Sequence, residues 1–218
     1  MDRPFPPQDS DLVLHLFAKV GPSNNRDASG KPIGAGTGQP AITWHDLAPL
    51  AKGNTLRSPD SKQDHAPMRQ LWGQSGVKQD RVALDFRPRN GKPCALTMGS
   101  VADKAADFPF GSTKPQGPSG LSLCIVFQAD SGKLPTRVAT LRSEKGAVVS
   151  LSVTKDKNLI AEVENGSGGK TNITSKDVDG TKPGVAFITW DAASGSISLR
   201  ARDATGRTFN AAGDPLPK

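Results

Sequence analysis

Short apolar segments with the alternation of β-strands recur along this chain and limit the folds open to it. The clearest pair is AFITW and SISLRAR, at residues 186–190 and 196–202, joined by the turn sequence DAASG. Comparable segments follow one another about every 8 to 12 residues without helical periodicity, which is typical of two-sheet β-proteins. The sequence therefore predicts an all-β fold, an antiparallel two-sheet sandwich of the jelly-roll kind.

The expected strands are separated by Gly, Pro, Asn and Asp, the residues that favour tight turns. Residues 21–40, rich in Gly, Asn, Ser and Pro, are expected to form a long loop, and the one expected helix is a short one near 101–107. The strands are expected at 11–18, 41–48, 81–86, 94–98, 121–128, 137–142, 147–154, 159–164, 170–175, 185–190, 196–202 and 207–209.

The length of 218 residues suits one all-β domain with a sizeable core. The 23 glycines and 18 prolines indicate many turns without reaching the level that suggests disorder. The prolines within residues 1–10 favour an extended N-terminal arm. A single domain is expected over 11–209, and residues 210–218 are left as a C-terminal tail.

Positive charge exceeds negative charge, with 28 Lys and Arg against 21 Asp and Glu, a net charge of +7. The basic residues are dispersed as single residues, which is typical of a solvated surface, so nucleic acid is not an expected partner. Only three of the acids are Glu, and a preference for Asp fits a protein rich in turns.

No segment has the roughly 18 consecutive apolar residues of a membrane span, so no transmembrane segment is expected. The nearest candidate for a signal peptide, Leu12–Val20, is interrupted by His15 and Lys19. If the protein is exported, we expect its signal peptide to have been removed from this chain.

Several motifs lie in an order that resembles a known family. The series begins with Leu12-Val-Leu-His-Leu-Phe-Ala18 and continues with Trp44-His-Asp-Leu47 and Val82-Ala-Leu-Asp-Phe86. It ends with Leu121-Ser-Leu-Cys-Ile-Val-Phe127 and the hairpin 185–206. This order resembles the concanavalin A-like lectin/glucanase superfamily, in its laminin-G-like (LamG-like) branch. The resemblance implies a jelly-roll sandwich and a location outside the cytoplasm, whether periplasmic, cell-surface or secreted.

The sequence departs from this family in two places. The tract 21–40 is longer than such modules need, and the closing strand that normally returns beside the first strand is not found after residue 209. The chain is then a fragment, closes differently, or receives the strand from another polypeptide. Other protein subunits are the expected partners, one of which could supply this strand.

Catalysis is not expected. Glucanases of this superfamily use paired carboxylates, and the only close glutamate pair in this chain is Glu162 and Glu164. Two residues apart on a strand, they share a face, but no Asp lies between them and no aromatic residues surround them. A solvent-facing pair is the preferred interpretation.

Few residues are left as candidates for binding a ligand. The candidate ligand-binding residues are Trp72, His45 and Asp46. Trp72 lies in a polar and irregular segment, and His45 and Asp46 follow Trp44. The other aromatic residues are expected in the core. Asp177 and Asp179 resemble part of a calcium loop, and calcium is the one cofactor that the sequence suggests. Cys94 and Cys124 could form a disulfide or remain thiols.

The function expected from these observations is that of a non-catalytic binding or assembly module, in which loops or an open edge contact other proteins of a larger assembly. A carbohydrate-binding lectin is the alternative, with a preference for acidic glycans because the chain is basic. A glycoside hydrolase ranks below both.

Overall fold

The computed structural model describes most of the C-terminal half of the chain and shorter pieces of the N-terminal half. Contacts divide the chain into two compact units, 1–108 and 109–218, and the single domain expected over 11–209 stays a prediction. The described residues are 22–26, 32–34, 36–44, 56–58, 65–71, 82–88, 91–92, 94–98, 120–142, 147–164, 168–191 and 194–215.

The described residues of the first unit form short strands. Five of them form a sheet in the order β2-β1-β3-β4-β7, and β5 pairs with β6 in a hairpin-like ladder. The strands are β1 (Pro22–Arg26), β2 (Pro32–Gly34), β3 (Thr43–Trp44), β4 (Leu56–Arg57), β5 (Met68–Leu71), β6 (Val82–Asp85) and β7 (Thr97–Met98). Strands β1 and β2 lie inside the tract 21–40, so the expectation of a loop throughout that tract is wrong.

The described residues of the second unit form eight longer antiparallel strands in two four-stranded sheets, ordered β12-β11-β10-β9 and β15-β14-β13-β8. A short 3₁₀ turn, η3 (Ser131–Lys133), separates β8 from β9. The strands are β8 (Gly120–Phe127), β9 (Thr136–Arg142), β10 (Val148–Val153), β11 (Leu159–Glu164), β12 (Lys170–Ser175), β13 (Gly184–Asp191), β14 (Ile197–Asp203) and β15 (Thr208–Gly213).

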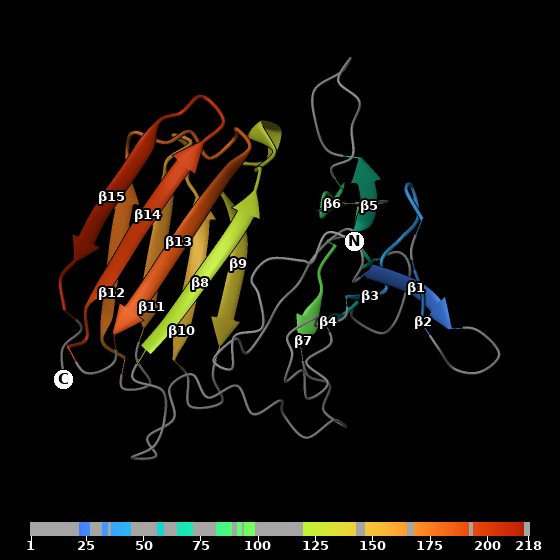
Figure 1. Ribbon diagram of the computed structural model, residues 1–218, viewed down its shortest axis with the longest axis horizontal. Helices are drawn as coiled ribbons and strands as arrows, with labels where there is room; N and C mark the ends of the chain where they lie inside the picture. The colour runs from blue at the N-terminus through green and yellow to red at the C-terminus, as the bar shows by residue number, and fades with distance from the viewer. Residues whose placement is uncertain are drawn as a thin grey trace, which may run out of the picture. The chain divides into compact units, whose positions relative to one another are not determined.

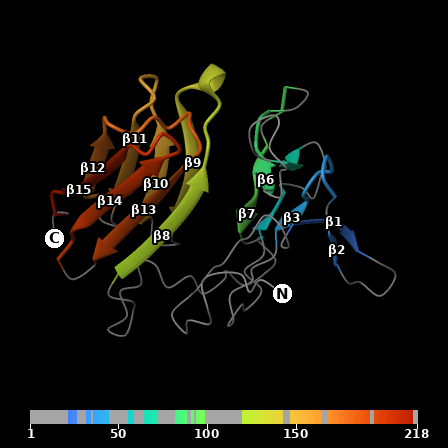
Figure 2. The ribbon, with the colours of Figure 1, turned by 45° about the horizontal axis from the view of Figure 1, so that its top comes forward.

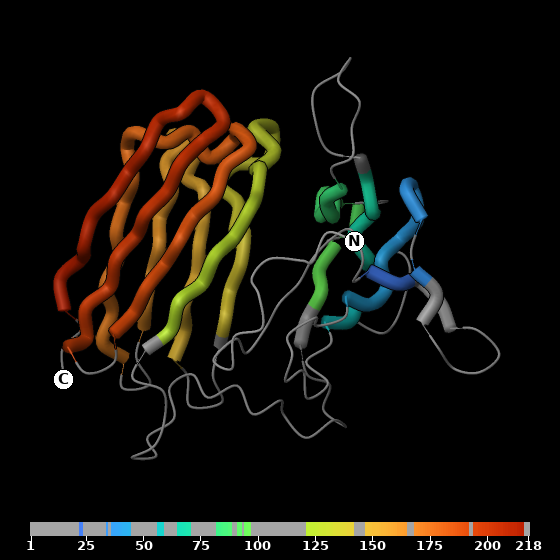
Figure 3. Tube along the Cα trace, in the orientation of Figure 1, coloured from blue at the N-terminus to red at the C-terminus, as the bar shows by residue number. Residues whose placement is uncertain are grey.

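These two sheets lie one behind the other in Figure 1, and Figure 2 shows the same two layers from a turned viewpoint. The tube in Figure 3 follows the chain from β8, over η3, into β9 of the other layer, and from β12 back into β13. The chain therefore crosses between the layers twice, and β13 pairs with both β8 and β14.

Side chains that point between the two layers form the core. Alternation along each strand places one set of residues inside and the other outside, as the pleat of a β-strand requires. The largest fully buried apolar side chains of the two sheets are Val149, Leu151 and Val153 of β10, Leu159 and Val163 of β11, Ile188 of β13, and Ile197 and Leu199 of β14.

Strand β15 closes one side of this core. A Cβ added to Gly213 would lie 2.9 Å from a side-chain carbon of Ile173 on β12 and equally close to one of Ile197. Glycine at this position therefore lets the two sheets approach closely where β15 meets β12.

The all-β prediction is confirmed for the described residues, which contain no α-helix. Strands β11 and β12 have the expected bounds, whereas β15 runs to Gly213, four residues past the expected end of the last strand at 209. The expected arm at 1–10, the strand 11–18 and the helix 101–107 lie outside the described residues, and the jelly-roll topology stays a prediction.

Candidate interaction surface at strand β8

The outer face of the β15-β14-β13-β8 sheet carries exposed apolar side chains. Val126 on β8 is 64% exposed and Phe187 on β13 is 48% exposed. Val126 lies directly opposite Val185, and Cys124 lies directly opposite Phe187. These four residues, Cys124, Val126, Val185 and Phe187, form an apolar strip along β8 and β13, and an exposed strip of this kind is typical of a binding surface.

Two arginines border the apolar strip. Arg200 on β14 is the cross-strand neighbour of Phe187, and Arg202 is the neighbour of Val185. Both arginines are exposed. Because neighbours across antiparallel strands have Cβ atoms about 5 Å apart, each guanidinium group can reach over the adjacent apolar side chain. The surface thus offers apolar contact next to positive charge.

Cys124 belongs to this surface as a neutral thiol. Partial burial raises the pKa of its thiol above the ordinary value, so the reactive thiolate is disfavoured. Cys94, in the first unit, is half-buried, and both cysteines are thiols in the structure. Cys124 therefore acts as a small apolar residue in the strip.

The inner row of β8 is less well covered than the inner rows of its neighbours. Leu121, Leu123 and Ile125 are each only partly buried, whereas Ile188 on β13 and Leu199 on β14 are 1% and 0% exposed. Strand β8 forms the edge of its sheet within the described part of the chain. The core is therefore open along β8 in that part, in contrast to its closed side at β15.

Backbone pairing shows which way the peptide groups of β13 point. The N–H of Asp191 donates to the carbonyl oxygen of Ser196 at 2.9 Å, so these two residues form a hydrogen-bonded pair between β13 and β14. Along an antiparallel strand, residues bond alternately to one neighbour and then to the other. Phe187 lies an even number of residues from Asp191, so its backbone N–H and C=O groups also pair with β14. The N–H and C=O groups of Ile188, the next residue, pair with β8.

The same alternation settles the directions on β8. Leu123 lies opposite Ile188, and the backbone groups of these two residues bond to each other. The residues on either side of Leu123, Ser122 and Cys124, therefore point their N–H and C=O groups away from β13. Three consecutive pairs of N–H and C=O groups therefore face the open edge with the spacing of a strand ladder. They belong to Ser122, Cys124 and Val126.

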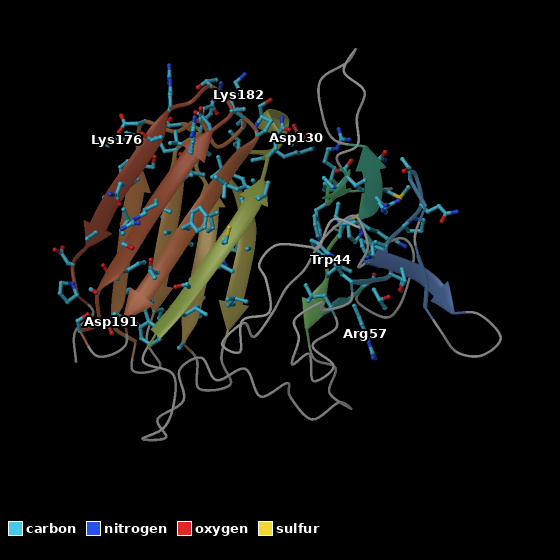
Figure 4. The ribbon with its side chains drawn as sticks, in the orientation of Figure 1. Trp44, Arg57, Asp130, Lys176, Lys182 and Asp191 are labelled. Carbon is cyan, nitrogen blue, oxygen red and sulfur yellow. The ribbon has the colours of Figure 1, made fainter. Side chains whose placement is uncertain are left out.

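The candidate calcium residues lie in a loop cluster at one end of the two sheets, the end marked by Lys176, Lys182 and Asp130 in Figure 4. Oδ1 of Asp179 accepts hydrogen bonds from the N–H and hydroxyl of Thr181, at 2.9 and 2.6 Å, and Asp177 is exposed.

Calcium binding by Asp177 and Asp179 stays a prediction. Among the residues that the structure describes, no group of three or more His, Cys, Asp or Glu side chains is placed to hold a metal ion. The two hydrogen bonds that Oδ1 of Asp179 accepts from Thr181 are those of an Asx turn.

The glutamate pair lies on the outer face of the other sheet. Oε2 of Glu162 is 3.9 Å from a guanidinium nitrogen of Arg137, and Oε2 of Glu164 is 3.1 Å from Nζ of Lys170. Ser150 Oγ donates to Glu162 at 3.3 Å. The two carboxylates share a face, as the spacing predicts, and each has a cation beside it in the manner of surface ion pairs.

The other candidate ligand-binding residues cannot be placed in this surface. Trp72, His45 and Asp46 lie outside the described residues. Trp44, which precedes two of them, is half-buried on β3. The structure instead points to Phe187, an aromatic residue expected in the core on general grounds. Its position in the alternation with Thr189 and Asp191 was the sequence signal that it faces solvent.

Comparisons with family models, with curated proteins and with solved structures found no match to this chain. The resemblance to the LamG-like branch therefore stays a prediction based on short motifs. Among the described residues, no helix has the length and hydrophobicity needed to span a bilayer.

Proposed function

We propose that this chain is a non-catalytic binding module that contacts another protein through the apolar strip and the β8 edge. In this proposal residues 11–209 form a LamG-like jelly roll that works outside the cytoplasm, as one component of a larger assembly. The observation that carries the proposal is the exposure of Val126 on β8 and of Phe187 on the adjacent strand β13, where β8 is the edge of the sheet among the described residues.

The physical reason is that this arrangement leaves apolar surface and strand hydrogen-bonding groups in water together. The side chains of Val126 and Phe187 stay in water after folding. Covering them with a partner removes this apolar surface from water, which lowers the free energy of the complex. Aromatic and arginine side chains, such as Phe187 and Arg200, are also the types enriched at the centres of protein interfaces.

Partner capture by the full-length chain tests this proposal. A double variant, Val126→Ser with Phe187→Ser, should lose its co-purifying protein while keeping its thermal unfolding midpoint within a few degrees, because both side chains are exposed. A matched variant, Thr140→Ala with Asn172→Ala, changes exposed positions on the outer face of the other sheet and should retain the partner. Retention of the same protein by the double serine variant would contradict the proposal.

One observation favours a second candidate, the binding of an acidic glycan. Phe187 offers an exposed ring for stacking on a sugar, and Arg200 beside it offers a cation for a carboxylate or sulfate. Binding of the chain to acidic members of a glycan array, lost in Phe187→Ser, would support this candidate. An array without hits at moderate salt would remove it.

A further inference from the structure

Strand edges expose unpaired peptide groups, and folded proteins usually protect them with charge, bulges or a covering element. Within the described part of the second unit the two sheets end in four edge strands, β8, β9, β12 and β15. These four edge strands differ in charge, in regularity and in how closely they pack, and therefore in how readily each could pair with another strand.

Strand β9 is protected in two ways. It carries the exposed Arg137, and its register with β10 shifts between Leu151 and Ser152, so that Val138 is an extra residue on β9. A bulge bends the edge and interrupts the ladder, and charged side chains oppose the approach of a second strand. This edge is a poor template for strand addition.

The edges formed by β12 and β15 are protected by other means. Strand β12 begins with Lys170 and contains no large apolar residue except Ile173, which is buried. Strand β15 packs closely on β12 through Gly213, and its outward residues include Thr208 and Asn210. Neither edge offers a row of apolar side chains to an added strand.

Within the part of the chain that the structure describes, strand β8 has none of these devices. Its eight residues, GLSLCIVF, contain no charge and no proline, and its pairing with β13 runs without a register shift. Its inner row, Leu121, Leu123 and Ile125, is half-exposed, and alternate peptide groups face outward. A long, regular and apolar edge strand is the form that accepts a further strand.

From this contrast we infer that the β8 edge binds an extended segment of a partner protein, which adds as a fifth strand to the β15-β14-β13-β8 sheet. The inference rests on the proposed function and names the partner's chemistry. The segment carries apolar residues on the side that faces the half-exposed Leu121, Leu123 and Ile125. Its alternate residues, on the outer side, are acidic.

Charge on this side of the unit determines the acidic character of the partner. Strand β8 is uncharged, and the outer face of its sheet presents Arg200 and Arg202 on β14, next to β13. The one acid on β13, Asp191, lies at the far end of that strand (Figure 4) and accepts a hydrogen bond from Ser194. Arg200 and Arg202 therefore favour acidic side chains on the outer side of an added strand.

A second copy of the chain is a less suitable occupant. Pairing β8 with the β8 of another copy would bring Arg200 and Arg202 of both molecules to the same face of a joined sheet, and the whole chain carries a net charge of +7. Like charges in an interface oppose association. An acidic strand removes this repulsion.

The first test uses peptides of eight residues, the length of β8. Fluorescence polarisation with the full chain compares labelled (Val-Glu)₄, (Val-Lys)₄ and a (Val-Glu)₄ analogue with proline at its centre. We expect (Val-Glu)₄ to bind about ten-fold or more tightly than (Val-Lys)₄, with affinity that falls as salt is raised. The proline analogue should not bind, because it cannot complete the ladder. Equal binding of the two charged peptides, or no binding of either, overturns the inference.

The second test blocks the edge. Cys124→Pro removes an N–H that points away from β13, so the native ladder keeps its hydrogen bonds while the added strand loses one. The matched control is Asn210→Pro, which by the same alternation changes an outward N–H on β15, the opposite edge of the same sheet. Peptide binding should be lost in the first variant and kept in the second. Binding that survives in both variants contradicts strand addition to β8.

A measurement on the unaltered chain covers the case in which Cys124→Pro fails to fold. Amide hydrogen exchange, followed residue by residue, should show new protection at Ser122, Cys124 and Val126 when (Val-Glu)₄ is added. Leu123 and Ile125, already bonded to β13, should change little. Protection confined to other strands, or no new protection, overturns the inference.

The outcomes separate this inference from the proposed function. If the natural partner is captured through Val126 and Phe187 but is retained by Cys124→Pro, the binding module stands and strand addition fails. If the chain is a dimer that Cys124→Pro converts to a monomer, the β8 edge belongs to a second copy and the acidic partner is excluded.

Discussion

The backbone N–H of Asp179 donates a hydrogen bond to Oδ2 of Asp203 at 3.2 Å, and so joins the β12–β13 loop to the β14–β15 turn. Oδ1 of Asp203 accepts three more hydrogen bonds, from the N–H and hydroxyl of Thr205 and from the N–H of Arg207. Asp203 is 3% exposed. One buried carboxylate therefore organises two loops at this end of the sheets.

We predict that Asp203→Ala lowers the free energy of unfolding by about 2 kcal/mol, because it leaves several backbone donors without their acceptor. Urea denaturation followed by circular dichroism measures the loss. Asp156→Ala, at an exposed turn position, is the control and should change the free energy of unfolding by no more than about 0.5 kcal/mol. Equal stability of the two variants would count against this role of Asp203.

Stability should depend on pH through the same carboxylates. Burial alone would raise the pKa of Asp203, but its hydrogen bonds from Thr205, Asp179 and Arg207 hold the pKa below the ordinary value. The pKa of Asp179 is lowered in the same way, against its own burial, by Thr181 and by nearby Lys157 and Lys182.

A lowered pKa in the folded state means that the folded protein holds these protons less tightly than the unfolded chain does. The stabilisation is therefore complete above the unfolded Asp pKa of about 3.9 and is lost as pH falls through the lower folded pKa. Urea midpoints should stay level from about pH 7 to pH 5 and decline below about pH 4. Asp203→Asn should flatten this decline, and an unchanged pH profile in that variant would refute the assignment to Asp203.

Gly180 gives a third prediction. It is buried, and a Cβ at this position would lie 2.7 and 2.8 Å from the two Cγ atoms of Val153. Gly180→Ala should therefore lower the free energy of unfolding by about 1 to 3 kcal/mol through overpacking. Gly132→Ala is the control, because its Cβ would meet only Asp130 Oδ1 at 3.4 Å. Adding Val153→Ala to Gly180→Ala should recover part of the lost stability. Thermal unfolding should therefore rank Gly132→Ala as the most stable variant, the double variant next and Gly180→Ala last.

Two buried serines offer a matched comparison. Oγ of Ser175 has no hydrogen-bond partner within the described part of the chain, whereas Oγ of Ser150 donates to Glu162. Ser175→Ala should be neutral or raise the free energy of unfolding by up to about 1 kcal/mol, because a buried hydroxyl without a partner is unfavourable. Ser150→Ala should lower it by about 0.5 to 1 kcal/mol. A larger loss for Ser175→Ala than for Ser150→Ala would reverse this interpretation.

Strand positions could be predicted from the sequence wherever the apolar alternation is strong. Strands β11 and β12 have the expected bounds because both show clear alternation between turns. Strand β1, PSNNR, has no such pattern and depends on pairing with β2 and β3. Strand β15 ends in Asn, Ala and Gly, which have low strand propensity, and Gly213 is placed by contact with Ile173 rather than by local preference.

The candidate site could be predicted only in part. Alternation places Phe187 on the outer face with Thr189, and this much is visible in the sequence. Which strand stays at an edge depends on pairing between segments far apart in the chain, such as Cys124 with Phe187. The open edge of β8 is therefore a property of the sheet order, which no local pattern encodes.

The neighbouring pair Ile188 and Leu123 provides a last prediction about this edge. The two residues lie directly opposite each other, but Ile188 is 1% exposed while Leu123 is only partly buried. Ile188→Ala should lower the free energy of unfolding by about 3 to 4 kcal/mol, and Leu123→Ala by about half as much, because less apolar surface returns to water. Urea denaturation of the full chain measures both losses. Saturating (Val-Glu)₄ should raise the stability of the unaltered chain more than that of Leu123→Ala, since the peptide covers this side chain. Equal losses for the two alanine variants would show that β8 is covered within the chain itself and would leave no edge for a partner.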